Sequence, residues 1–99
     1  MIRAHFLEEK GKPVGFEISG HSLFSESGTD IVCAAVSSAA ILVANTLTEN
    51  FGIEAEVKTQ EGLLFFKTEP NETTQGILSG LKLHLEQLAE QYPQNITVS

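Results

Sequence analysis

The sequence predicts a single α+β domain over residues 1–99, in which a β-sheet carries two helices on one face. The chain is long enough for one hydrophobic core and too short for a second. Apolar and polar residues alternate in several short segments, as in strands, and two longer segments have helical spacing. The expected element order is β-β-α-β-β-α-β, which from residue 13 onward is the order of a split β-α-β unit.

Two strands open the chain as a hairpin. Every second residue in them is apolar: Ile2, Ala4, Phe6, Val14, Phe16 and Ile18. The residues between the strands, Lys10-Gly11-Lys12-Pro13, are typical of a turn. Residues 20–29 have neither helical nor strand period, so we expect an exposed loop there. Long ordered loops in compact domains are often functional.

The first helix is expected to begin after a cap at Thr29 or Asp30 and to end at Gly52, which suits the position after a helix C-cap. The uncharged run 31–48 superficially resembles a membrane span. Serine, threonine and asparagine dilute this run, and it has no basic flank, so a buried helix is favoured. Because its interior has almost no charge, we expect other elements to cover it on most sides.

The second half of the chain repeats the β-β-α order of the first half. Strands are expected at about 54–59 and at 63–68, joined by the turn Gln60-Glu61-Gly62. Pro70-Asn71-Glu72 opens a second helix, which ends at Tyr92-Pro93. One face of that helix is apolar and would serve as core or as a dimer surface: Ile77, Leu78, Leu81, Leu85 and Leu88. A last strand is expected around 96–98.

Composition excludes several functional classes. Six Lys and Arg against thirteen Asp and Glu give a net charge of −7, and the basic residues are scattered, which argues against nucleic-acid binding. The single cysteine excludes an intramolecular disulfide, and the first residues lack the apolar core of a signal peptide, so a cytoplasmic location is expected. His5, His21, His84 and Cys33 match no metal-site spacing, and no phosphate-binding loop occurs; we expect neither metal nor cofactor.

Cys33 and His21 are the candidate reactive groups. A cysteine about three residues into a helix lies near unpaired backbone N–H groups, whose partial positive charge favours the thiolate. His21 follows the second strand and could lie within hydrogen-bond reach of that thiol, forming a Cys–His pair. The alternatives are that Cys33 is a small core residue and His21 a solvated loop residue.

Four residues are expected to support this pair. Asp30 would cap the helix and fix the turn that carries Cys33. Ser37, one turn beyond Cys33, could pack or donate a hydrogen bond into the site. Gly20 ends the second strand, and Gly28 has the features of a hinge in the 22–29 loop.

The combination of Gly20-His21, the Ser/Gly-rich loop, Gly28 and the run from Asp30 to Ser37 resembles the ribosomal-processing cysteine protease (Prp) family of bacteria. The resemblance implies a cytoplasmic, homodimeric endopeptidase with Cys33 as nucleophile and His21 as general base and acid. It also implies the substrate, the N-terminal extension of large-subunit ribosomal protein number twenty-seven. That extension would end in a hydrophobic segment, and the mature protein would begin with basic residues.

A non-enzymatic, ribosome-associated α+β interaction module is the alternative function. In such a module Cys33 would only pack in the core. Thiol reactivity separates the two possibilities, because an inert, buried thiol favours the module and a fast-reacting thiol favours the enzyme.

Overall fold

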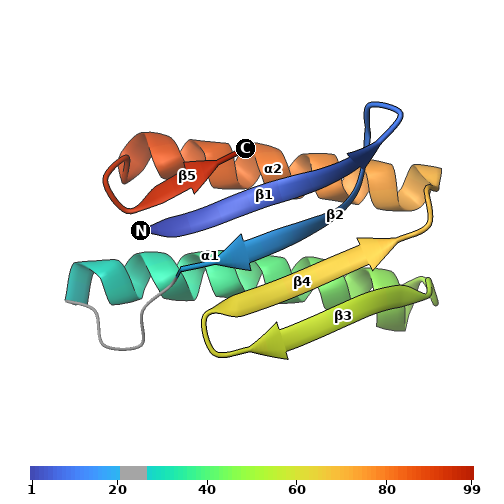
Figure 1. Ribbon diagram of the computed structural model, residues 1–99, viewed down its shortest axis with the longest axis horizontal. Coiled ribbons are helices and arrows are strands. Elements are labelled where there is room, and N and C mark those ends of the chain that lie inside the picture. Colours follow the sequence, from blue (N-terminus) through green and yellow to red (C-terminus); the bar gives the residue numbers. More distant parts are fainter. Residues whose placement is uncertain (21–26) are drawn as a thin grey trace.

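The sheet begins with the expected hairpin, and the remaining elements follow in the predicted order (Figure 1). The computed structural model describes the backbone of residues 1–20 and 27–99, and the side chains of residues 1–20 and 31–99. The elements are β1 (Ile2–Glu9), β2 (Lys12–Ser19), α1 (Ser27–Asn45), a π-helical turn (Thr46–Asn50), β3 (Ala55–Gln60), β4 (Leu63–Thr68), α2 (Glu72–Gln91) and β5 (Ile96–Val98).

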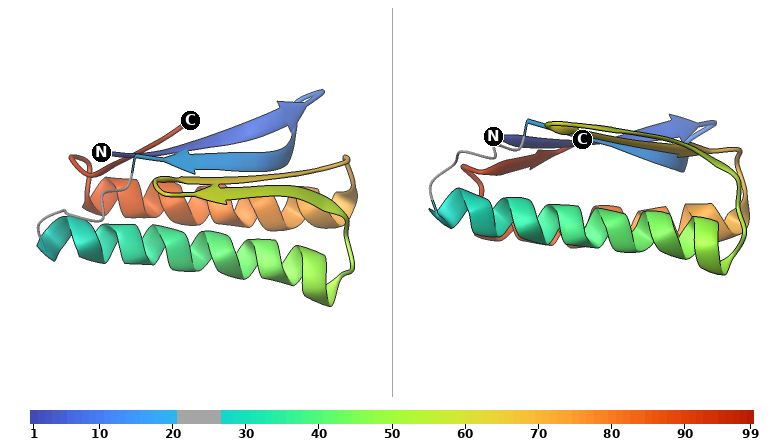
Figure 2. Two further views of the ribbon diagram at one scale, coloured as in Figure 1. Left: turned by 60° about the horizontal axis from the view of Figure 1, so that its bottom comes forward. Right: turned by 90° about the horizontal axis from the view of Figure 1, so that it is seen from below.

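In the described part of the chain the strands form one mixed sheet in the order β3-β4-β2-β1-β5. All neighbouring strands are antiparallel except β1 and β5, which are parallel. Both helices lie on the same face of this sheet, α2 under β1 and β5 and α1 nearer β4 and β3 (Figure 2). The predicted α+β arrangement is confirmed.

Three aromatic side chains on the helix-facing side form the centre of the core. The register places Phe6 opposite Phe16 and Phe16 opposite Phe66. Their ring centroids are 6.2 and 5.4 Å apart, and all three side chains are buried. The alternation of apolar and polar residues in the strands therefore indicates which side chains point to the helices.

The second helix begins as the sequence predicts. Asn71 is its N-cap, and the side-chain oxygen Oδ1 accepts a hydrogen bond of 2.7 Å from the N–H of Thr74. This bond satisfies one of the backbone donors left free at a helix start. Tyr92 is the C-cap, and its N–H donates to the Leu88 carbonyl. Leu78, Leu81 and Leu85 are buried, so this stripe is core.

The first helix begins earlier than predicted. It starts at Ser27, so Asp30 lies in the first turn and is not the cap. Gly28 also lies in this turn, and residues 27–29 are helical and not part of a loop. Periodicity could not detect this turn because Ser-Gly-Thr-Asp has no apolar residue to mark a buried face. An aspartate is also favourable in a first turn, where it interacts with the helix dipole.

The first helix is covered on one side only, which corrects the expectation of a helix enclosed on most sides. Its buried stripe is regular and faces the core: Val32, Val36, Ala40 and Ala44. Ile31, Ile41 and Leu42 are 63, 49 and 67 % exposed. By length and composition, the segment Ile31–Asn50 is long and apolar enough to cross a membrane. In the structure its inner stripe packs against the sheet.

The end of this helical segment has the predicted glycine. Beyond Asn45 the backbone widens into a single π-helical turn, in which the N–H of Phe51 donates to the Thr46 carbonyl. Gly52 then adopts a φ of +65°, the left-handed conformation that glycine accepts without a steric penalty. The N–H of Ile53 closes the turn on the Leu47 carbonyl at 2.9 Å.

Candidate active site

Cys33 is the seventh residue of α1 and lies on the border between core and solvent. Its side chain is partly buried and packs against the hydrophobic core, whereas its neighbour Val32 is fully buried. Ser37, one turn further along, is also partly buried. A thiol in this position is held by packing and remains accessible, as a nucleophile must be.

The early start of α1 changes the electrostatic argument for Cys33. The free backbone N–H groups of the described part of this helix are those of Ser27 to Thr29, one turn before the cysteine, whereas Cys33 lies in the second turn. Side chains of a helix lean toward its N-terminus, so the thiol leans over that first turn. The favourable field of the helix start therefore acts on Cys33 from one turn away and is weaker than a first-turn position would give.

Gly20 occupies a position that only glycine tolerates. Its φ is +84°, and a Cβ there would overlap the carbonyl oxygen of Met1. The N–H of Gly20 donates to the Gly62 carbonyl at 3.2 Å. The chain therefore leaves β2 beside the turn between β3 and β4. The sequence indicated Gly20 as a supporting residue. The structure shows why a glycine is needed: the Met1 carbonyl, which is distant in the sequence, lies against it, and no local sequence pattern reveals this contact.

The predicted partner of the thiol, His21, lies outside the described residues, as do residues 22–26 of the predicted loop. Of the other predicted site residues, the structure places Cys33 and Ser37 on one flank of α1 and Gly20 at the end of β2. The Cys33–His21 pair therefore stays a prediction.

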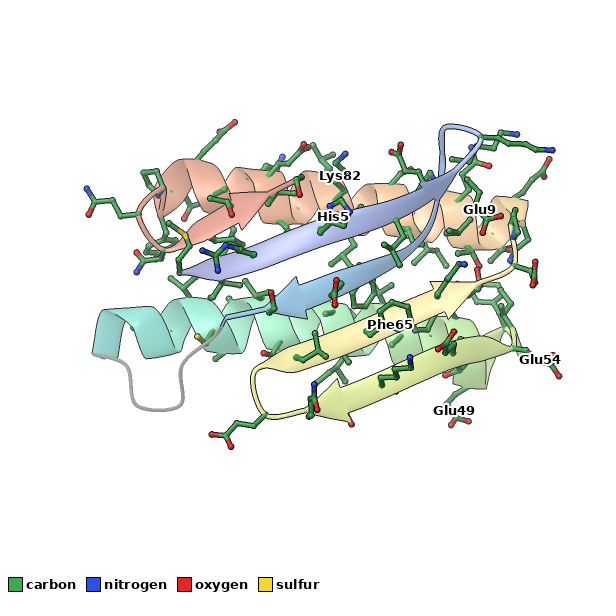
Figure 3. The ribbon with its side chains drawn as sticks, in the orientation of Figure 1. His5, Glu9, Glu49, Glu54, Phe65 and Lys82 are labelled. Carbon is green, nitrogen blue, oxygen red and sulfur yellow. The ribbon has the colours of Figure 1, made fainter. Side chains whose placement is uncertain are left out.

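The two described histidines lie elsewhere. His5 is on the sheet face opposite the helices, where its Nδ1 is hydrogen-bonded to the hydroxyl of Ser99 at 2.9 Å (Figure 3). His84 lies on α2 and lines an apolar hollow between the two helices with Ala39, Leu42 and Ile77. Within residues 1–20 and 31–99, no three His, Cys, Asp or Glu side chains are grouped to hold a metal ion.

A shallow hollow in the described part of the chain lies away from the thiol and is not lined by Cys33. It has a volume of about 550 Å³ and lies on the open sheet face, where His5, Leu7, Glu9, Phe65 and Lys67 contribute to its lining (Figure 3). Glu9 and Lys67 form an exposed ion pair of 3.4 Å there. Such a pair contributes little to stability.

Comparison with known proteins decides the family. The family model described as cysteine protease Prp matches residues 1–97 of the chain. The chain belongs to the Prp cysteine protease family. It is 27 % identical to the ribosomal processing cysteine protease Prp of Bacillus subtilis (strain 168) over 108 residues, an alignment that covers 100 % of this chain and 96 % of that protein.

Solved structures support the same fold. A Streptococcus mutans protein superposes with a TM-score of 0.87 at 29 % identity, covering 100 % of this chain and 96 % of the other. The essential ribosomal processing protease Prp of Staphylococcus aureus, solved with a substrate peptide, gives a TM-score of 0.89 at 23 % identity over 100 and 98 %. A further structure of the Staphylococcus aureus protease contains a covalently linked product peptide (24 % identity, TM-score 0.85, 100 and 98 % covered).

Membership of the Prp family makes this protein a cysteine peptidase, as the resemblance implied. Cys33 is the chain's single cysteine. A cysteine peptidase needs a thiol nucleophile, so Cys33 stays the predicted nucleophile. The alternative of a non-enzymatic interaction module is not retained.

Proposed function

We propose that this Prp protein is a cytoplasmic endopeptidase that removes the N-terminal extension of large-subunit ribosomal protein number twenty-seven during ribosome maturation. Cys33 is the nucleophile and His21 the general base and acid. The observation that carries the proposal is the position of Cys33, accessible on the flank of α1 one turn from free backbone N–H groups. The name of the Bacillus subtilis relative supports the ribosomal substrate.

The chemistry follows from these two groups. His21 accepts the thiol proton, and Sγ of Cys33 attacks the scissile carbonyl carbon. The C–N bond of the resulting tetrahedral intermediate breaks as the imidazolium returns its proton to the leaving amine, and an acyl-enzyme thioester remains. Water, deprotonated by His21, attacks the thioester and releases the carboxylate product and the thiol. The covalent product peptide in the Staphylococcus aureus structure supports an intermediate of this kind.

Charge on the tetrahedral intermediate needs hydrogen-bond donors. The free N–H groups of Ser27 to Thr29 are the donors that the described backbone offers nearest to Cys33. Because the thiol leans over this turn, the carbonyl oxygen of a substrate attacked by Sγ would develop its negative charge on the same side. This arrangement gives Gly28 a backbone role in catalysis in place of the hinge role expected from the sequence.

The decisive experiment uses the natural substrate. Purified protein is incubated with the unprocessed ribosomal protein of the organism that encodes it, and the products are identified by mass spectrometry. Wild type should release the N-terminal extension by a single cut, and Cys33→Ala should release none. Alanine fits the helix, so thermal melts of the two proteins should agree to within a few degrees. Cleavage by a folded Cys33→Ala protein, or no cleavage by wild type, would overturn the proposal.

We further propose that the protein is a homodimer whose interface is the outer face of α1 together with the hollow that α1 shares with α2. Ile31 and Leu42 are the most exposed large apolar residues of α1. An apolar hollow beside Leu42 is lined from α2 by Ile77 and Gly80. An uncharged, exposed helix next to such a hollow suits a second copy of itself, because a two-fold interface brings the same patch to both sides.

A further inference from the structure

The edge of the sheet formed by β3 is open. Within the described part of the chain β3 pairs with β4 only, and all of its residues except Ala55 are exposed. The opposite edge, β5, has three residues, whereas β3 has six. An uncovered edge strand presents unpaired N–H and C=O groups to which another extended chain can bind.

The register identifies which backbone groups are free. Gln60 pairs with Leu63 across a two-residue turn and is the closing hydrogen-bonded pair of the hairpin. Hydrogen-bonded pairs alternate along an antiparallel ladder, so Lys58 and Glu56 also direct their N–H and C=O groups to β4. The backbone groups of Ala55, Val57 and Thr59 therefore point outward.

The same residues direct their side chains toward the helices. Val57 is opposite Phe66, whose side chain is fully buried on the helix-facing side of the sheet. Val57 nevertheless remains 48 % exposed. The helix side of this edge is thus apolar and uncovered by the described residues, although it continues the core face of the sheet.

The flank of α1 nearest this edge carries the nucleophile. Ala39, Leu42 and Val43 line the hollow shared with α2. Three residues each follow a member of the buried stripe directly in the sequence: Cys33, Ser37 and Ile41. They lie on the opposite flank of the helix, turned away from α2. Because α2 lies under β1 and β5, that flank of α1 lies toward β3 (Figure 2). Ile41 is 49 % exposed, like Val57.

The two ends of this surface are marked by different residues. One end carries Cys33, and β3 runs toward that end, where its turn contacts Gly20 (Figure 1). At the far end Glu49 and Glu54 flank the connection from the helix to β3 (Figure 3). From Cys33 to Glu49 the helix spans about 24 Å. This distance equals about seven residues of extended chain.

We propose that the residues before the cleaved bond bind as an added strand on the β3 edge, parallel to β3. Their backbone groups pair with Ala55, Val57 and Thr59, and alternate side chains contact Val57 and Ile41. The scissile bond then reaches Cys33, and the positively charged N-terminus of a short apolar extension meets Glu49 and Glu54. This inference rests on the proposed proteolytic function and adds where and in which conformation the substrate binds.

Hydrogen exchange tests the pairing directly. The probe is a synthetic peptide with the sequence of the N-terminal extension and the first residues of the mature ribosomal protein, bound to inactive Cys33→Ala. In the free protein the amides of Ala55, Val57 and Thr59 should exchange fast, and those of Lys58 and Gln60 slowly. Peptide binding should slow the first three by at least about tenfold, the protection expected of a hydrogen bond with a free energy near 1.4 kcal/mol.

Substitution of the edge provides the second test, on the active enzyme. Val57→Pro removes an outward N–H and leaves the ladder to β4 intact. It should lower kcat/KM for the peptide by about tenfold or more. Val98→Pro is the matched control at the other edge. Ser99 and not Val98 pairs with β1 through its N–H to Ala4, so the N–H of Val98 also points outward. Cleavage by Val98→Pro should match wild type.

The substrate provides a third test that needs no protein variant. Peptides N-methylated at successive positions before the cut should lose cleavage at every second position, because alternate amides of a strand face its neighbour. If wild type cleaves the peptide but the β3 amides stay unprotected and the methyl scan shows no alternation, the strand proposal is overturned and the proteolytic function stands. If wild type does not cleave the peptide and Cys33→Ala does not bind it, both are overturned.

Discussion

The two helices pack on the same sheet, yet their outer faces differ completely. α2 has an apolar inner stripe and an outer face with exposed carboxylates at Glu72, Glu86 and Glu90. α1 has no charged residue from Ile31 to Thr48, although only one side of it is buried. Core packing requires the inner stripes alone. Packing within one copy of the chain therefore does not account for the apolar outer face and flank of α1, which are the surfaces that we propose a second copy and the substrate to cover.

The largest expected effect separates His21, the proposed partner of the Cys33 thiol, from His84 on α2. His21→Ala should lower the cleavage rate by about two to four orders of magnitude, the usual contribution of a general base and acid. His84→Ala removes the same side chain from α2 and should leave the rate unchanged. Rates are measured on the unprocessed ribosomal protein under identical conditions.

The reactivity of the thiol provides the control for this pair of variants. Iodoacetamide should alkylate Cys33 more slowly at neutral pH in His21→Ala than in wild type, and at the wild-type rate in His84→Ala. Matching alkylation rates in all three proteins across pH would mean that His21 does not act on the thiol.

The sequence predicted the regular parts of the fold well, because each element has an apolar period that its burial requires. The strand at Leu63–Thr68 matches the structure to the residue, and the N-cap of the second helix, Asn71, lies within the predicted opening Pro70-Asn71-Glu72. The start of α1 was wrong, since Ser27 to Asp30 contain no apolar residue that reports burial. The strand order was not predicted, because pairing of β1 with β5 depends on contacts between the two ends of the chain.

The sequence predicted which residue types form the candidate site, but it predicted only some of their positions in the fold. The motif indicated the family correctly, and Cys33 as nucleophile stays a prediction. The motif could not show why Gly20 must be glycine, because the Met1 carbonyl approaches it from the N-terminus. Sequence also missed the β3 edge as a binding surface. Glu56, Lys58 and Gln60 were visible as polar alternation, but whether a strand is at an edge is a property of the whole sheet.

A second comparison tests the role of the outer faces. Leu42→Glu places a charge in the proposed dimer interface and should convert the dimer to a monomer, measured by analytical ultracentrifugation. Leu83→Glu is the matched variant on α2, where the leucine is 57 % exposed and does not line the hollow between the helices. This variant should remain dimeric. Loss of the dimer in both variants, or in neither, would show that the interface is not the outer face of α1.

A third comparison concerns the two helix starts. Asn71→Ala removes the cap hydrogen bond to Thr74 and should lower the free energy of unfolding by about 0.5–2 kcal/mol. Asp30→Ala changes a first-turn residue and should lower it by about 0.3–1 kcal/mol through the helix dipole alone. Urea unfolding of both variants measures the difference. A larger loss for Asp30→Ala than for Asn71→Ala would restore Asp30 as the cap of α1.

The smallest change in the free energy of unfolding is expected at the buried hydroxyl of Thr74 in α2. The hydroxyl of Thr74 is fully buried, and no described residue bonds with it, whereas its backbone N–H is used by the Asn71 cap. Thr74→Val keeps the shape and the N–H but removes the unpaired hydroxyl. Because an unsatisfied buried hydroxyl is destabilising, we expect a gain of up to about 1 kcal/mol in urea unfolding. Thr73→Val, at the exposed neighbouring position, is the control and should show no gain. A loss of stability in Thr74→Val would show that the hydroxyl has a partner in the folded protein.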